Sequence, residues 1–180
     1  MSSAEDNDLV RATLQGDREA FGELVDRHQM KLYNMALRIT GNKEDALDVS
    51  QAAFLKAYDK LRQFKPQYRF FSWLYRIAMN EALDLVNHRR ALTELSPELP
   101  ERTAGPEAEC WGIEAGRRLQ AALMELEPAY RAVIVLRHLH GLSYREIGDV
   151  VGAPERTVKS RLFTARQRLR ATLSAGGVTP

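Results

Sequence analysis

The sequence predicts an all-α protein of two small helical domains joined by an acidic, flexible linker. Apolar residues recur with the period of a helix through most of the 180 residues. No stretch alternates polar and apolar residues between turn signals, as a strand would. Residues 91–114 are the exception, because they combine prolines and glycines with six acidic side chains and one basic side chain. We therefore expect domains at residues 1–90 and 115–180 and a linker at residues 91–114.

Turn and cap residues indicate where the helices of the first domain begin and end. Gly41 can end one helix, and Asn42 can cap the next. The helical pattern that follows runs from Lys43 to Arg62, and Pro66 breaks it. A further helix is expected from Arg69 to Arg90.

The second domain carries the signals of two short helices joined by a tight turn. Ser143 and Glu146 fit a capping box at the start of the first helix. Gly148 lets the second helix approach closely, and Gly152 lets the chain turn where a bulkier residue would be strained. These signals predict a helix-turn-helix motif.

The second helix of this motif has an apolar side and a basic side. The apolar stripe should face the core, and it consists of Val158, Leu162, Ala165 and Leu169. The opposite side suits a DNA major groove, where phosphates fix position and base edges give sequence. The alternative is a solvated basic face with Phe163 packed on a neighbour. The side chains predicted to contact DNA are Arg156, Lys159, Ser160, Phe163 and Arg166.

In the helix expected from Arg69 to Arg90, Trp73 lies on a polar face. Stacking on an unpaired base would use such a tryptophan, and nearby amides could read the edge of that base. Trp73 can equally fold back against the loop before it. The other members of this face are Arg76, Asn80, Asp84 and Asn87.

The loop from Gln63 to Phe70 mixes aromatic and basic residues. Its aromatic side chains, Phe64, Tyr68 and Phe70, can form a pocket for a flipped base. Alternatively, the loop is an ordered turn that Phe64 and Phe70 hold in place. The spacing of these residues leaves both interpretations open.

The helix from Lys43 to Arg62 has small residues on one side and acidic residues on the other. The small stripe allows another helix to pack closely. On the acidic side, Asp48 and Gln51 lie near an exposed Leu55. Acidic groups around an exposed leucine suit docking on a basic partner helix, and a merely solvated face is the alternative.

Charge is unevenly distributed along the chain, although the formal net charge is only +2. Residues 1–90 hold 14 basic and 13 acidic side chains, whereas residues 115–180 hold 11 basic and 5 acidic ones. A basic second domain is what a phosphate backbone would attract.

The composition argues against several classes of protein. Cys110 is the only cysteine, which excludes an intramolecular disulfide and a zinc site built on paired cysteines. No glycine-rich phosphate loop or nucleophile motif is present, and a helix points His138 and His140 in different directions. We expect no catalytic residue, metal or cofactor. Without a signal peptide or an apolar run long enough to span a membrane, the chain is expected in the cytoplasm.

Three segments, in this order, resemble the extracytoplasmic-function sigma factors of bacterial RNA polymerase. Residues 48–58 (DVSQAAFLKAY) resemble region 2.2 of the family. Residues 71–80 (FSWLYRIAMN) resemble the start of its promoter-reading helix, and residues 141–148 (GLSYREIG) resemble the opening of region 4.2. The resemblance covers nearly the whole chain outside the linker. It implies a sigma-2-like domain followed by a sigma-4-like helix-turn-helix domain.

The resemblance also implies a function. The protein would be a non-catalytic subunit that binds core RNA polymerase, directs it to promoters and promotes strand opening. The contacts implied with the polymerase, at its beta-prime clamp, are Asp48, Gln51 and Leu55; the beta flap is a second expected contact. The contacts implied with the unwound minus-10 element are Phe64, Tyr68, Phe70, Trp73, Arg76 and Asn80. The contacts implied with the minus-35 element are Arg156, Lys159, Ser160, Phe163 and Arg166. An anti-sigma protein is a further expected partner, and no membrane insertion is expected.

Two positions depart from the family pattern. Ala52 stands where an acidic residue is usual, and Thr164 stands where many members carry a basic residue. The strength of the polymerase contact and the minus-35 sequence preference of the family therefore cannot be assigned to this chain.

Two other classes of protein compete with this interpretation, a free-standing helix-turn-helix regulator and a helical adaptor that binds only proteins. A free-standing regulator would give Trp73 and the loop before it no function. The basic face around Phe163, which suits DNA, argues against an adaptor that binds only proteins.

Overall fold

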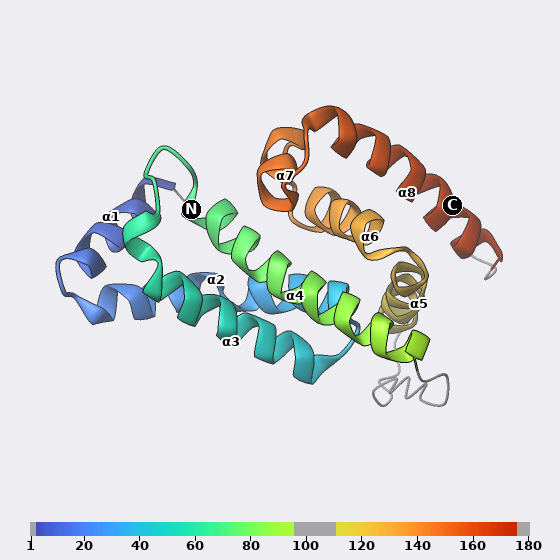
Figure 1. The fold of residues 1–180 in the computed structure, drawn as a ribbon, viewed down its shortest axis with the longest axis horizontal. Coiled ribbons are helices and arrows are strands. Elements are labelled where there is room, and N and C mark those ends of the chain that lie inside the picture. Colours follow the sequence, from blue (N-terminus) through green and yellow to red (C-terminus); the bar gives the residue numbers. More distant parts are fainter. Residues whose placement is uncertain (1–2, 96–110, 176–180) are drawn as a thin grey trace.

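The described residues of this computed structural model, 3–95 and 111–175, form helices joined by short turns (Figure 1). This confirms the all-α prediction. The amino-terminal unit contains α1 (Ser3–Leu14), α2 (Arg18–Thr40), α3 (Lys43–Asp59), the 3₁₀ turn η1 (Leu61–Gln63) and α4 (Phe70–Leu95). The carboxy-terminal unit contains α5 (Trp111–Glu125), α6 (Pro128–Ile134), the π-helical turn η2 (Val135–Leu139), α7 (Tyr144–Val151) and α8 (Glu155–Ala175). Within the described part of the chain, no helix is long and apolar enough to cross a membrane.

The turn between α2 and α3 follows the predicted cap residues. Gly41 has a φ of 75°, in the left-handed region, and its N–H donates to the Leu37 carbonyl at 2.9 Å. The Asn42 side chain accepts hydrogen bonds from the N–H groups of Glu44, at 2.8 Å, and Asp45, at 3.1 Å. Helix α2 therefore ends, and α3 begins, where the sequence indicates. Helix α3 ends at Asp59, three residues before the predicted Arg62, and the 3₁₀ turn η1 follows it.

The core of the amino-terminal unit lies between α2, α3 and α4, since α3 packs against both of the other helices (Figure 1). The predicted small stripe of α3 is buried, as Ala46, Ala53 and Ala57 are fully inaccessible and Ser50 is 5% exposed. Small side chains let the three backbones approach closely. The larger side chains that fill the remaining space include Leu24, Leu32, Met35, Ile39, Phe70 and Leu74.

Helix α4 continues past the predicted domain boundary and ends at Leu95, and α5 begins at Trp111. Residues 91–95 contain no helix breaker, so nothing local stops the helix there. Pro97 is the first residue that a helix interior excludes, and it also disfavours the helical conformation of the residue before it. The remainder of the predicted linker, with Cys110, lies outside the described residues.

The two units pack against each other, which the sequence did not predict. Helix α7 lies against α4, and α5 and η2 contact α2 (Figure 1). The side chain of Met124 covers Gly41 at the end of α2. The contacts join segments about 80 to 90 residues apart in the chain, such as Arg38 with Gln120, whose side chains are hydrogen-bonded at 2.9 Å.

Arg131 of α6 connects the ends of α2 and α5. Its side chain is 5% exposed, and its guanidinium donates to the carbonyls of Leu123 and Met124 at 2.8 and 2.9 Å. It also donates to Leu126, at 3.0 Å, and to Ile39 near the end of α2. The last carbonyls of a helix lack partners within the helix and carry the negative end of its dipole, so one cation stabilises two helix ends. Burial lowers the pKa of Arg131 to about 10, which leaves it charged at neutral pH.

We predict that Arg131→Met lowers the free energy of unfolding by about 2–4 kcal/mol, because it leaves buried carbonyls without donors. Arg156→Met, which removes the same charge from an exposed position, should change it by less than about 0.5 kcal/mol. Urea denaturation followed by circular dichroism measures both. Equal stabilities of the two variants would contradict the role given to Arg131.

Candidate nucleic-acid and partner interfaces

The helix-turn-helix motif is held by the capping box and the two glycines that the sequence indicated. The Ser143 hydroxyl accepts from the Glu146 N–H at 3.2 Å, and the Glu146 carboxylate accepts from the Ser143 N–H at 2.9 Å. A Cβ atom on Gly148 would lie 2.6 Å from the carbonyl oxygen of Ala153, so only glycine fits there. Gly152 has a φ of 64° and ends α7 in the left-handed conformation.

Helix α8 turns its apolar stripe inward and its basic face outward. Val158, Leu162 and Ala165 are at most 2% exposed, while the side chain of Phe163 is 65% exposed. Phe163 therefore does not pack on a neighbour, which removes the alternative interpretation of that residue. The other predicted contacts of this face are exposed as well, and they are Arg156, Lys159, Ser160 and Arg166.

Two cations of this face have partners on the protein surface. Lys159 forms an ion pair with Glu155 at 2.8 Å, one turn earlier in α8, and this carboxylate raises its pKa. The Nε of Arg166 donates to Nε2 of His138 at 3.2 Å, which requires that nitrogen to be unprotonated. Partial burial, with the charges of Arg166 and Arg137, lowers the pKa of His138. At neutral pH the face therefore retains its positive charge.

The loop before α4 is an ordered turn held by buried phenylalanines. Phe64 is 7% exposed and Phe70 is fully buried, with their ring centroids 5.7 Å apart. Both rings also pack on Trp73, at 5.5 Å from Phe64 and 5.9 Å from Phe70. Of the two interpretations of this loop, the structure supports the ordered turn. Phe64 and Phe70 present no ring to a base in this conformation, because the hydrophobic core takes up both.

The remaining predicted residues of this region lie at the surface. Trp73 is half-buried, so it leans on the aromatic cluster while part of its ring stays accessible. Tyr68 is 47% exposed, and Arg76 and Asn80 are exposed. Arg76 lines a hollow together with residues of α7 and the following turn, and Arg69 lies 3.6 Å from Glu146. The helix-turn-helix unit therefore engages this side of α4.

Helix α3 presents an exposed apolar stripe that is longer than predicted. Leu55 is 68% exposed, and Asp48 and Gln51 are exposed beside it. Leu47 is 50% exposed and Tyr58 is 44% exposed, and their spacing places both on the Leu55 side of the helix. Neither Leu47 nor Tyr58 was among the residues predicted for this face. The helical spacing of positions 47, 51, 55 and 58 could have indicated that these residues share one face of the helix.

Comparison with known proteins identifies both units. The Sigma-70 region 2 family matches residues 24–91, and the Sigma-70 region 4 family matches residues 116–169. The chain is 32% identical to ECF RNA polymerase sigma factor SigW of Bacillus subtilis over 91% of this chain and 94% of that protein. It is 34% identical to the ECF RNA polymerase sigma-E factor of Escherichia coli over 91% and 92% of the two chains.

The chain belongs to the ECF RNA polymerase sigma factors. These are transcription initiation factors and not enzymes in the usual sense. They act with core RNA polymerase at promoter DNA. A solved structure of CnrH in complex with the cytosolic domain of CnrY has a TM-score of 0.74 to this sigma factor, at 32% identity, covering 95% of this chain and 98% of that chain.

Tyr75 and His140 form a further contact between the two units of the sigma factor. The Tyr75 hydroxyl lies 3.1 Å from the Lys31 carbonyl oxygen and 2.9 Å from Nδ1 of His140. A carbonyl only accepts, so the hydroxyl donates to Lys31 and Nδ1–H of His140 donates to the hydroxyl. Burial, with the charge of Lys31, lowers the pKa of His140 to about 4. His140 is therefore held by a hydrogen bond that joins the two units.

We predict that the folded sigma factor becomes less stable as the pH falls from about 6.5 towards 4. The ordinary pKa of 6.5 applies to His140 in the unfolded chain, whereas the folded state lowers it to about 4. Between these values the unfolded chain binds more protons, so acid favours unfolding. Urea midpoints measured at pH 7 and pH 5 test this, with His140→Gln as the matched variant. An undiminished pH dependence in His140→Gln would show that another group is responsible.

Proposed function

We propose that this sigma factor reads the minus-35 element with the exposed face of α8. The observation that carries this proposal is Phe163, a large aromatic side chain left 65% exposed between Lys159 and Arg166. An exposed ring is unfavourable in water unless it meets a partner, and cations on either side suit a phosphate backbone. Arg156 and Ser160 extend the same face and complete the set of proposed contacts.

For the unwound minus-10 strand, we propose contacts with the accessible part of the loop and of α4. Tyr68 and Trp73 offer ring surface on which an unpaired base can stack, and Arg76 and Asn80 offer hydrogen-bond donors. Phe64 and Phe70 act indirectly in this proposal, because they hold the loop and support the Trp73 ring. A rearrangement of the loop would be needed for either phenylalanine to meet a base.

For core polymerase, we propose docking through the exposed stripe of α3. Leu55 and Gln51 lie at its centre, Asp48 supplies negative charge, and Leu47 and Tyr58 extend the apolar area. A stripe of this composition suits a helix of the beta-prime clamp that carries basic residues. The beta flap is the proposed partner of the carboxy-terminal unit. Such a factor would work in the cytoplasm.

An anti-sigma protein is a further proposed partner. The solved structure of CnrH contains the cytosolic domain of a second protein, CnrY. A sigma factor from Bartonella quintana with a similar fold, at a TM-score of 0.75 and 24% identity, was solved with the anti-sigma factor NepR. The exposed apolar stripe of α3 is a surface that such a protein could cover.

We predict that replacing Lys159 and Phe163 together with alanine weakens promoter binding by holoenzyme by about tenfold or more, because each specific contact contributes about 1–3 kcal/mol. Binding to core polymerase should be unchanged, since α3 is untouched. Arg118→Ala, an exposed cation on α5, is the control for loss of charge. Fluorescence anisotropy with labelled promoter DNA measures the affinity. Unchanged promoter affinity of the double variant would reject the assignment of this face.

The experiment that tests the proposed function compares the sigma factor alone, core polymerase alone and both together. Because each unit offers few DNA contacts, the isolated protein should bind promoter DNA weakly. Specific footprinting and run-off transcription should appear together when core polymerase is added at fixed salt. Tight footprinting by the protein alone, with no transcript on adding core polymerase, would instead favour a free-standing helix-turn-helix regulator.

A further inference from the structure

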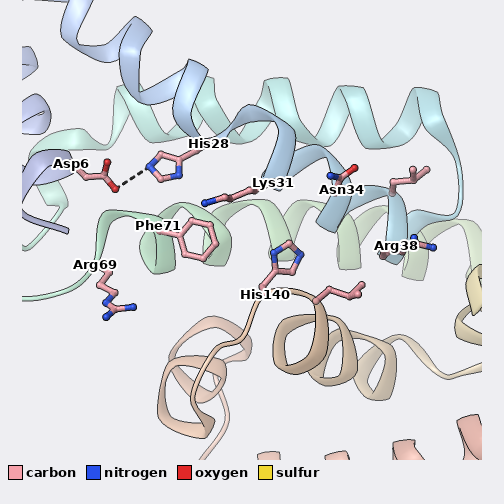
Figure 2. A pocket seen from close by; sticks show the side chains of 10 residues that line it. Asp6, His28, Lys31, Asn34, Arg38, Arg69, Phe71 and His140 are labelled. Carbon is pink, nitrogen blue, oxygen red and sulfur yellow. Dashed lines mark hydrogen bonds and ion pairs between the residues drawn. The ribbon is translucent and has the colours of Figure 1, made fainter. Parts of the chain in front are cut away.

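A cleft opens where the two units of the sigma factor meet (Figure 2). Its volume is about 640 Å³, within the range of small-molecule sites of about 300–1,000 Å³. One wall is a face of α2 formed by Lys31, Asn34 and Arg38. Phe71 of α4 and His140, which follows η2, line the opposite side, so both units contribute to the cleft.

The cleft carries an excess of positive charge. Its cations are Lys31, Arg38 and Arg69, and its one carboxylate is that of Asp6. Asp6 is already paired, at 3.0 Å with His28 and at 3.6 Å with Arg27. Arg38 and Arg69 also have partners on the protein. Lys31, by contrast, forms no ion pair with any described residue, and its amine lies over the Phe71 ring, 5.8 Å from the ring centroid.

Two buried imidazole nitrogens also belong to this cleft. Nδ1 of His28 and Nε2 of His140 have no hydrogen-bond partner among the described residues. His28 is 6% exposed, and Asp6 holds its other nitrogen, as Tyr75 holds that of His140. Both rings are therefore fixed in orientation. Buried polar atoms without a partner are rare in folded proteins. Neither nitrogen is accessible to solvent here, so each would meet a ligand only after a small shift of its ring, and the exposed Lys31 amine is the group that points to one.

Lys31 lies between these two histidines. Its side chain extends towards His28 and Phe71 (Figure 2), and its charge contributes to the lowered pKa of both His28 and His140. An anion at the Lys31 amine would offset this repulsion. An imidazole nitrogen that moves into contact with the ligand would accept from a phosphate hydroxyl when neutral and donate to a phosphate oxygen when protonated.

We propose that the cleft binds a small organic phosphate, and that the bound ligand holds the two units together. Lys31 and the Asn34 amide would bind one phosphate group, flanked by His28 and His140. Arg38 lies seven positions after Lys31 on α2, about 10 Å along the helix, so a second anionic group of an extended ligand can reach it.

Such a ligand would couple a metabolite to promoter recognition. It contacts α2 of one unit and His140 of the other, so it binds the closed arrangement more tightly than an open one. The closed arrangement engages Arg69 and Arg76 on the side of α4 that carries the proposed minus-10 contacts. This consequence for promoter recognition, though not the binding itself, rests on the proposed function.

The binding test uses inorganic pyrophosphate as the probe and the isolated full-length sigma factor. Pyrophosphate should raise the thermal midpoint relative to chloride of equal ionic strength. Lys31→Met should weaken binding by about tenfold or more, since it removes one charge-assisted hydrogen bond. Lys159→Met removes a lysine from α8 and should bind as the parent does. Equal affinities of the parent and Lys31→Met, or a loss in Lys159→Met, would overturn the proposed site.

Two further measurements define the ligand and its effect. Citrate in place of pyrophosphate separates phosphate recognition from general anion binding, and we expect it to bind at least about tenfold more weakly. Dyes placed by Leu14→Cys and Ser174→Cys, in a Cys110→Ser background, report the distance between the units. Pyrophosphate should raise energy transfer between them, and no change would reject the closing effect. Neither readout involves DNA or polymerase, so a failure here leaves the proposed function standing.

Discussion

The guanidinium of Arg131 is the buried interaction on which the packing of α6 depends, and one of its hydrogen bonds joins the two units. It is a buried charge without a carboxylate partner among the described residues, which a protein interior tolerates only when the hydrogen-bonding capacity of the group is used. Four backbone carbonyls supply that capacity, and they belong to the ends of α2 and α5 and to the turn that follows α5. One side chain therefore fixes α6 against its own unit and also fixes that unit against the other.

This junction gives the proposed DNA-contacting surfaces different accessibility. The outer face of α8 points away from the junction, so Lys159 and Phe163 remain exposed while the units are packed together. The side of α4 that carries the proposed minus-10 contacts lies next to α7. There Arg69 forms an ion pair with Glu146, and Arg76 lines a hollow together with residues of α7. Access to duplex DNA in this state is therefore better for the carboxy-terminal unit than for the amino-terminal one.

The helix caps and turns were predicted well because they depend on interactions between residues close together in the chain. Asn42, Ser143 and Gly152 act on backbone groups within a few residues of themselves, so their spacing alone specifies their role. Arg131 lies in an ordinary helical pattern. No residue near it in the sequence indicates that its guanidinium donates to the Ile39 carbonyl, 92 positions away. The contact between Tyr75 and His140, 65 positions apart, was hidden for the same reason.

In the loop before α4, too, the sequence pattern did not reveal which side chains are buried, although the residues lie close together in the chain. Spacing identified Phe64 and Phe70 as important, but an aromatic ring that supports a turn and one that stacks on a base have the same sequence pattern. Burial distinguishes them, because a ring within a packed cluster has no face left for a base. The location of the candidate site stays a prediction, while the distinction between its buried and its accessible aromatic residues required the three-dimensional packing.

The polar contacts between the units are of a kind that water can replace when the units part. If the units part, Arg131 keeps the three carbonyls that lie beside it in its own unit and loses only that of Ile39. The ion pair of Arg69 with Glu146 and the hydrogen bond of Arg38 with Gln120 involve side chains that water can solvate. His140 would regain its ordinary affinity for protons on exposure. The buried apolar residues of the two units form one continuous cluster, however, so undocking also exposes apolar surface to water. That cost favours the docked arrangement until a partner covers the exposed surface.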